Sequence, residues 1–71
     1  MNKERRKRII DAIQKIESLV QNILDDEQEA YENMPESLQC SDNGIVSEDA
    51  QESLESAIEA LEDAIGFLEE I

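Results

Sequence analysis

Carboxylates are the only side chains in this sequence that are numerous and regular enough to suggest a chemical role. The chain has 19 Asp and Glu residues against 6 Lys and Arg, and its formal net charge is −13. Seventeen of the carboxylates lie in residues 16–71, which contain no Lys or Arg, so this segment carries −17. Spaced along a helix, such charges can imitate the phosphates of nucleic acid and attract a basic protein. The residues that we assign to this acidic face are Glu48, Glu52, Glu55, Glu59, Glu62 and Asp63.

The other patterns that carry chemistry are missing. The sequence has no histidine, and its single cysteine, Cys40, has no evident base partner. Catalysis by paired carboxylates needs a cleft that shifts two pKa values apart. The Asp42-Asn43-Gly44 stretch lacks the alternating ligands and the twelfth-position glutamate of an EF-hand loop. We therefore expect no catalytic residue, no metal site and no cofactor, and we expect the protein not to be an enzyme.

The basic residues are confined to the other end of the chain. Residues 1–15 hold all six Lys and Arg against Glu4 and Asp11, which gives this segment +4. Direct binding to nucleic acid is one interpretation, but the cluster is short, lacks aromatic residues and precedes a strongly acidic chain. The alternative, which we favour, is that this basic turn pairs with the acidic C-terminal end of the chain at Glu69 and Glu70.

Two long apolar patterns indicate two helices. Each has apolar residues that alternate at spacings of four and three, which is the a/d pattern of a heptad repeat. We expect helices over residues 3–33 and 47–71, with a connector at 34–46, and with the two patterns packed against each other. The first pattern is Ile9, Ile13, Ile16, Val20 and Ile23, and the second is Ala50, Leu54, Ala57, Leu61, Ala64, Leu68 and Ile71.

The connector contains the only proline of the chain. Asn33 is predicted to cap a short helical turn, with Pro35 in its first turn and Glu36 as the capping partner. This turn should extend to Gln39. Tyr31 and Leu38 are predicted to close the core at this end of the hairpin.

A second helix start is predicted after the short turn. Asn43 or Gly44 is expected to adopt a left-handed backbone conformation in a tight turn. Ile45 and Val46 should then fold back on the end of the hairpin, and Ser47 should be the N-cap of the second helix.

These elements define an all-α fold in which residues 1–71 form one domain, an antiparallel, coiled-coil-like two-helix hairpin. One apolar stripe is left over by the pairing described above, and a second copy of the chain would cover it. We therefore expect a homodimer in the form of a four-helix bundle. The residues of this predicted interface are Ile10, Leu24, Ile58, Ile65 and Phe67.

The expected function follows from these features. We expect a non-enzymatic protein–protein interaction module that acts through its helical faces. The alternative is an acidic mimic of nucleic acid that inhibits a nuclease or another defence protein. No segment has a leader's hydrophobic region or a run of about 18 apolar residues. A cytoplasmic protein without membrane contact is therefore expected.

The stretch EAYENMPESLQ, between a basic helix and an acidic heptad helix, resembles the core of a group of small acidic helical proteins of bacteria and their phages. The matching positions are Tyr31, Asn33, Pro35, Glu36, Leu38 and Gln39. The resemblance implies a helical hairpin, in a group for which inhibition of host defences has been suggested. It supplies neither a reaction nor binding residues.

Overall fold

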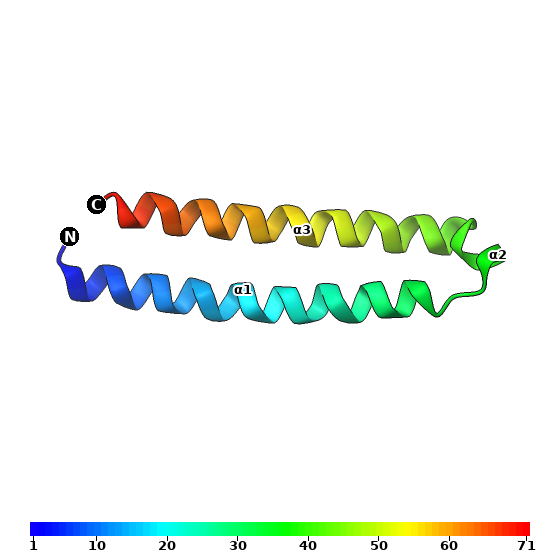
Figure 1. Cartoon of the computed structure of the whole chain (residues 1–71). Helices are drawn as coiled ribbons and strands as arrows, with labels where there is room; N and C mark the ends of the chain where they lie inside the picture. The colour runs from blue at the N-terminus through cyan, green and yellow to red at the C-terminus, as the bar shows by residue number, and fades with distance from the viewer.

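The protein is an antiparallel hairpin of two long helices. A computed structural model describes all residues from Met1 to Ile71. Helix α1 (Lys3–Glu32) and helix α3 (Asp42–Glu69) run side by side in opposite directions, and the short helix α2 (Glu36–Gln39) forms the corner between them (Figure 1). The two chain ends therefore lie at the same end of a rod that measures 54 × 15 × 10 Å. The all-α hairpin and the short helical turn confirm the prediction from sequence.

Asparagine residues cap both ends of helix α1. Asn2 has an extended backbone, and its side-chain oxygen accepts a hydrogen bond from the backbone N–H of Arg5 at 2.8 Å. This bond satisfies one of the N–H groups that a helix start leaves without a partner. At the other end, Asn33 is the C-cap of α1 and its N–H bonds back to the carbonyl of Glu29. The prediction that Asn33 caps the next helix is therefore wrong.

Pro35 occupies the N-cap position of α2, which was predicted for Asn33. Its fixed φ suits the residue that precedes a helix. Its carbonyl accepts hydrogen bonds from Leu38 and Gln39. Leu38 remains exposed at 43%, so the prediction that it plugs the end of the core is also wrong.

Helix α3 starts five residues earlier than predicted. Ser41 has the extended backbone of an N-cap, and Asp42 follows in the first turn, where its charge suits the helix dipole. The predicted left-handed residue does not exist, since no residue has a positive φ. Ser47 is a buried residue inside the helix and not its cap. Ile45 and Val46 are exposed and do not fold back on the hairpin end.

The close approach of the corner explains Gly44. This glycine is buried in the first turn of α3, and a Cβ added to it would lie 1.9 Å from the backbone oxygen of Gln39. A side chain there would collide with backbone that has no flexible end to move aside. Gly44 is therefore needed for space, whereas the sequence suggested that it was needed for backbone conformation.

Candidate interaction surface

The contact between α1 and α3 follows one heptad seam on each helix. We define the hairpin seam by the buried and half-buried residues that recur at spacings of four and three. On α1 they are Ile10, Ile13, Glu17, Val20, Leu24, Glu27 and Tyr31, and on α3 they are Ser47, Gln51, Leu54, Ile58, Leu61, Ile65 and Leu68. At about half of the positions, the residue in the observed seam is the one directly after the residue that was predicted.

This shift corrects the predicted interface. Leu24 is only 4% exposed and faces α3, so its assignment to an outer surface was wrong. Ile10, Ile58 and Ile65 are half-buried in the same seam. Of the five predicted residues, only Phe67 projects freely, with 70% of its surface exposed.

An apolar face lies on one side of the seam. The residue directly before each seam position is rotated by about 100° around its helix. Because the helices are antiparallel, this rotation turns the flanks of both helices toward the same side of the hairpin. We define the apolar face by the residues at these positions as far as Ile23 on α1, where Asp26 ends the apolar row, and by all of them on α3: Ile9, Ala12, Ile16, Leu19 and Ile23 on α1, and Val46, Ala50, Ser53, Ala57, Ala60, Ala64 and Phe67 on α3.

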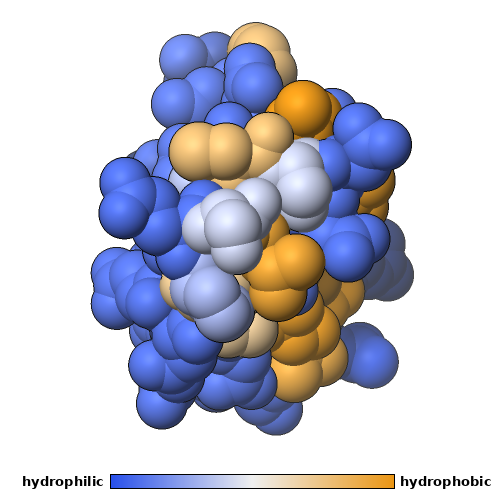
Figure 2. Space-filling view, turned by 90° about the vertical axis from the view of Figure 1, so that its right-hand side faces the viewer, coloured by the Kyte–Doolittle hydropathy of each residue, from blue (hydrophilic) through white to orange (hydrophobic).

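The exposure of this face is unusual for large aliphatic side chains. Leu19 is 59% exposed, and Ile16 and Ile23 are each about half exposed. Viewed onto the corner end, Figure 2 shows hydrophobic residues along one side of the molecule over both helices, with hydrophilic residues opposite. Large exposed apolar patches are the feature from which interaction sites are recognised in soluble proteins.

The acidic face lies on the opposite side. The residue directly after each seam position on α3 is a glutamate at six of seven positions, and the seventh is Gly66. The predicted acidic residues are all exposed, and five of the six occupy these positions, with Asp63 beside them. On α1 the corresponding positions are also polar or acidic: Asp11, Gln14, Ser18, Gln21, Asp25, Gln28 and Glu32.

The hairpin buries little of itself. Only three of the 71 residues, Leu24, Gly44 and Ser47, are buried, and the accessible surface is 5341 Å². A compact monomer of 8.1 kDa would expose about 4,500 Å². The excess of roughly 800 Å² is close to one partner's share of a standard protein interface.

Polar contacts across the seam fix the corner end of the hairpin. The Ser47 hydroxyl donates to the Glu27 carboxylate at 2.7 Å, and the Tyr31 hydroxyl donates to the Glu48 carboxylate at 2.6 Å. The hydrogen bond to Glu48 raises the pKa of Tyr31, and partial desolvation and the negative charge of Glu48 raise it further. The side-chain amide of Gln39 donates to the Tyr31 carbonyl at 2.9 Å. These contacts give Tyr31 and Gln39 structural roles.

A carboxylate pair lies where the seam meets the acidic face. Glu17 occupies a seam position that an apolar residue would normally fill, and it faces Glu62 on α3. Desolvation raises the pKa of Glu17, and Glu62 raises it further, because a protonated Glu17 can share a hydrogen bond with this carboxylate and because Glu62 is negatively charged. No group of three or more His, Cys, Asp or Glu side chains is arranged to hold a metal ion.

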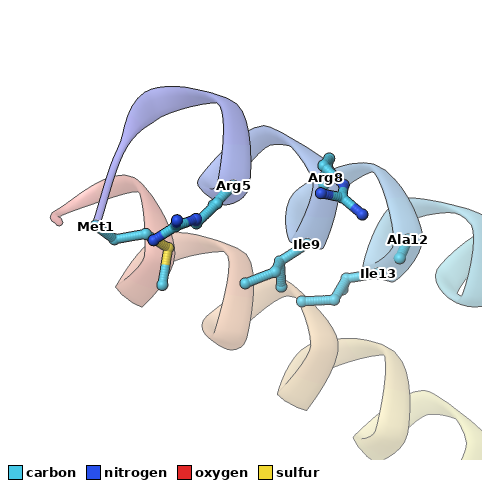
Figure 3. Close-up of a pocket in the computed structure, with 6 residues that line it drawn as sticks. All are labelled: Met1, Arg5, Arg8, Ile9, Ala12 and Ile13. Carbon is cyan, nitrogen blue, oxygen red and sulfur yellow. The ribbon is translucent and has the colours of Figure 1, made fainter.

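The basic turn does not make the pairs that were predicted for it. The only salt bridge joins Lys7 and Asp11 within α1, at 2.9 Å, and neither Glu69 nor Glu70 pairs with an arginine. Arg5 and Arg8 instead border an open pocket of about 530 Å³, whose apolar lining is Met1, Ile9, Ala12 and Ile13 (Figure 3). The pocket therefore continues the apolar face to the end of α1 and places two unpaired cations beside it.

Comparison with protein families, curated proteins and solved structures finds no match to this chain. Neither long helix contains a stretch long and apolar enough to cross a membrane.

Proposed function

We propose that this protein is a non-enzymatic protein–protein interaction module that binds through its apolar face. The observation that carries the proposal is the one-sided exposure of Ile16, Leu19, Ile23 and Phe67, opposite a face of glutamates. Burial of a single such side chain contributes about 1.5–3 kcal/mol. The simplest form of the module is a homodimeric four-helix bundle, in which each copy covers the face of the other.

The size of the core supports the proposal. A chain of this length lies near the lower limit for a fold with a single core, and small domains of this kind often gain stability by oligomerising. A hairpin with one buried hydrophobic side chain, Leu24, lies on the weak side of that limit. Covering the apolar face would complete the core.

The substitution I16D tests the proposal. An aspartate in the middle of a covered apolar face would be desolvated without a partner, so we expect the dimer dissociation constant to rise at least about a hundredfold. Sedimentation equilibrium over a range of concentrations measures this change. The matched control is S18D, which adds the same charge to the exposed, opposite face of the same helix. Equal association of both variants would contradict the proposal.

A second candidate function, an acidic mimic that inhibits a nuclease or defence protein, is supported by the glutamate rows of α3. The six glutamates that follow seam positions, over the 22 residues from Glu48 to Glu69, give one charge per roughly 5.5 Å of helix. One strand of DNA carries a phosphate about every 3.4 Å, so the mimicry would be of a sparsely charged single strand. This candidate ranks second because it leaves the apolar face without a role.

The quadruple substitution E52Q/E55Q/E59Q/E62Q separates the two functions. Under the mimic hypothesis, the protein should slow cleavage of single-stranded DNA by an extract of host cells. The variant should lose this effect, and added salt should weaken it steeply in the wild type through screening. I16D should inhibit as well as the wild type does. Inhibition that is independent of salt would contradict the mimic.

A further inference from the structure

We propose that the apolar face is occupied by a second copy of this chain, packed face to face in the antiparallel direction, so that the corner of each copy lies over the chain ends of the other. This inference rests on the proposed function. It goes further by specifying the direction in which the second copy packs. Three features of the hairpin carry it, namely the distribution of charge along the rod, the charges that border the apolar face, and the size pattern of the face.

The two halves of the rod carry very different charges. The half that contains the chain ends, residues 1–16 and 59–71, carries +4 and −5, a total of −1. The corner half, residues 17–58, carries −12. A dimer with both corners at one end would place the two −12 halves against each other. The antiparallel dimer places each −12 half against a −1 half, which removes most of that repulsion.

The charged residues that border the apolar face on α1 also favour the antiparallel dimer. Positive residues lie near one end of the helix, and negative residues lie at equivalent positions near the other end. Arg5 and Asp26 are 21 residues apart, as are Arg8 and Glu29, so the two members of each pair occupy the same position in the heptad. All four side chains are exposed, and none of them has an ion-pair partner within the hairpin. Reversal of one copy brings the arginines of each chain near the carboxylates of the other. A dimer with its corners together instead lays each α1 against α3 of the other copy, so these pairs of α1 residues do not form.

The sizes of the side chains also match under reversal. On α1 the face has Ile9 and Ile23 at its ends, on either side of Ile16. On α3 it has Val46 and Phe67 at its ends, with only alanine and serine between them. The large residues at the ends and in the middle of the α1 row, and those at the ends of the α3 row, therefore recur on reversal, whereas Ala12 and Leu19 exchange places. In the antiparallel dimer each row lies on the same row of the other copy, so the large residues at opposite ends of a row meet each other. The two acidic faces then point outward, which closes the assembly at two copies.

The native Cys40 allows a direct measurement of orientation. This thiol is exposed at the corner, and it is the only cysteine. A nitroxide label on Cys40 and pulsed dipolar spectroscopy should give a distance between labels comparable to the 54 Å length of the rod. If the corners are together, the labels should lie within roughly 20 Å, as expected for two helix layers. A short distance would overturn the antiparallel arrangement.

Paired charge reversals give an independent test. Chain R5E/R8E and chain D26K/E29K should each form a homodimer at least about tenfold weaker than that of the wild type, since each creates like-charge contacts at both ends. An equimolar mixture should form the heterodimer, because both ends then regain opposite charges. Native mass spectrometry of the mixture measures the heterodimer fraction. A fraction no greater than the one-half expected from random pairing would overturn the proposed contacts.

The outcomes distinguish this inference from the proposed function. A wild-type protein that stays monomeric at high micromolar concentration overturns both the homodimer and its orientation. A dimer that I16D disrupts, but whose labels on Cys40 lie close together, leaves the interaction module intact and overturns only the antiparallel packing. Helical content measured by circular dichroism shows whether the charge variants keep the hairpin. The substitutions should not weaken α1 itself, because they place acidic residues near its start and basic residues near its end, as the helix dipole favours.

Discussion

Single residues at the corner decide how closely the two helices approach. Gly44 leaves room for the backbone of Gln39, and Ser47, the next buried residue of α3, is small enough for the carboxylate of Glu27 to reach its hydroxyl. The Tyr31 hydrogen bond to Glu48 adds a third contact at the same end. Tyr31 and Gln39 thus help to shape the corner, and neither lies on the apolar face.

We expect G44A to destabilise the hairpin by about 1–3 kcal/mol, because the added methyl group must displace backbone. The control is G66A. Gly66 lies in the same helix with nothing within 4 Å of an added Cβ, so alanine should stabilise the protein there by roughly 0.5–1 kcal/mol. Urea denaturation of the two variants measures both changes. Similar effects of both substitutions would mean that the corner is not tightly packed.

At the scale of the elements, α1 carries two overlapping heptad patterns. Ile13 and Val20 belong to both of them, while Ile9, Ile16 and Ile23 belong to one and Ile10 and Leu24 to the other. The pairing that the structure adopts places the larger Ile58 and Ile65 of α3 at seam positions, where the predicted pattern would place Ala57 and Ala64, and partial burial of the larger side chains favours it. The same pairing places Glu17 at a seam position, which is unfavourable for a carboxylate.

The Glu17–Glu62 pair predicts a pH dependence of the hairpin. Since the folded state raises the pKa of Glu17, it binds this proton more tightly than the unfolded chain does. The free energy of unfolding should therefore rise as the pH falls from neutral through the raised pKa toward the ordinary value. At neutral pH, E17Q should be more stable than the wild type, and the difference should shrink as the pH is lowered.

The control for E17Q is E55Q, which removes one negative charge from the exposed acidic face. Both variants relieve the general repulsion of a chain with a net charge of −13. Only the difference in stability between the two variants therefore measures the effect of the Glu17–Glu62 pair. Thermal unfolding from pH 4 to pH 8, followed by circular dichroism, measures both. If the two variants have parallel pH profiles, the pair in the seam does not contribute.

The whole molecule is a two-sided rod with an asymmetric charge along its length. One side is apolar and the other acidic, and the corner half holds most of the negative charge. These two asymmetries act on different properties. The apolar side gives the free energy for association, whereas the charge distribution selects the direction in which two copies meet. A second copy bound in the antiparallel direction covers the apolar side and also keeps the two strongly negative halves apart.

The sequence by itself determined the two long helices and the hairpin, but not the start of α3 or the cap of α2. Uninterrupted heptads with a single proline between them permit two long helices and one reversal, and the short turn after Pro35 followed from local rules. It also identified the acidic residues of α3, because an exposed helical position needs no partner to be recognised.

Only the tertiary structure decided which apolar residues face inward. Adjacent heptad patterns differ by one residue, and no local preference separates Ile9 from Ile10 or Ile23 from Leu24. The choice depends on the two helices together, through the contacts of Gly44 and Ser47 at the corner and the larger isoleucines of α3. That rotation moved Leu24 into the seam and turned Ile16, Leu19 and Ile23 outward, and so it defined the surface on which the proposed function depends.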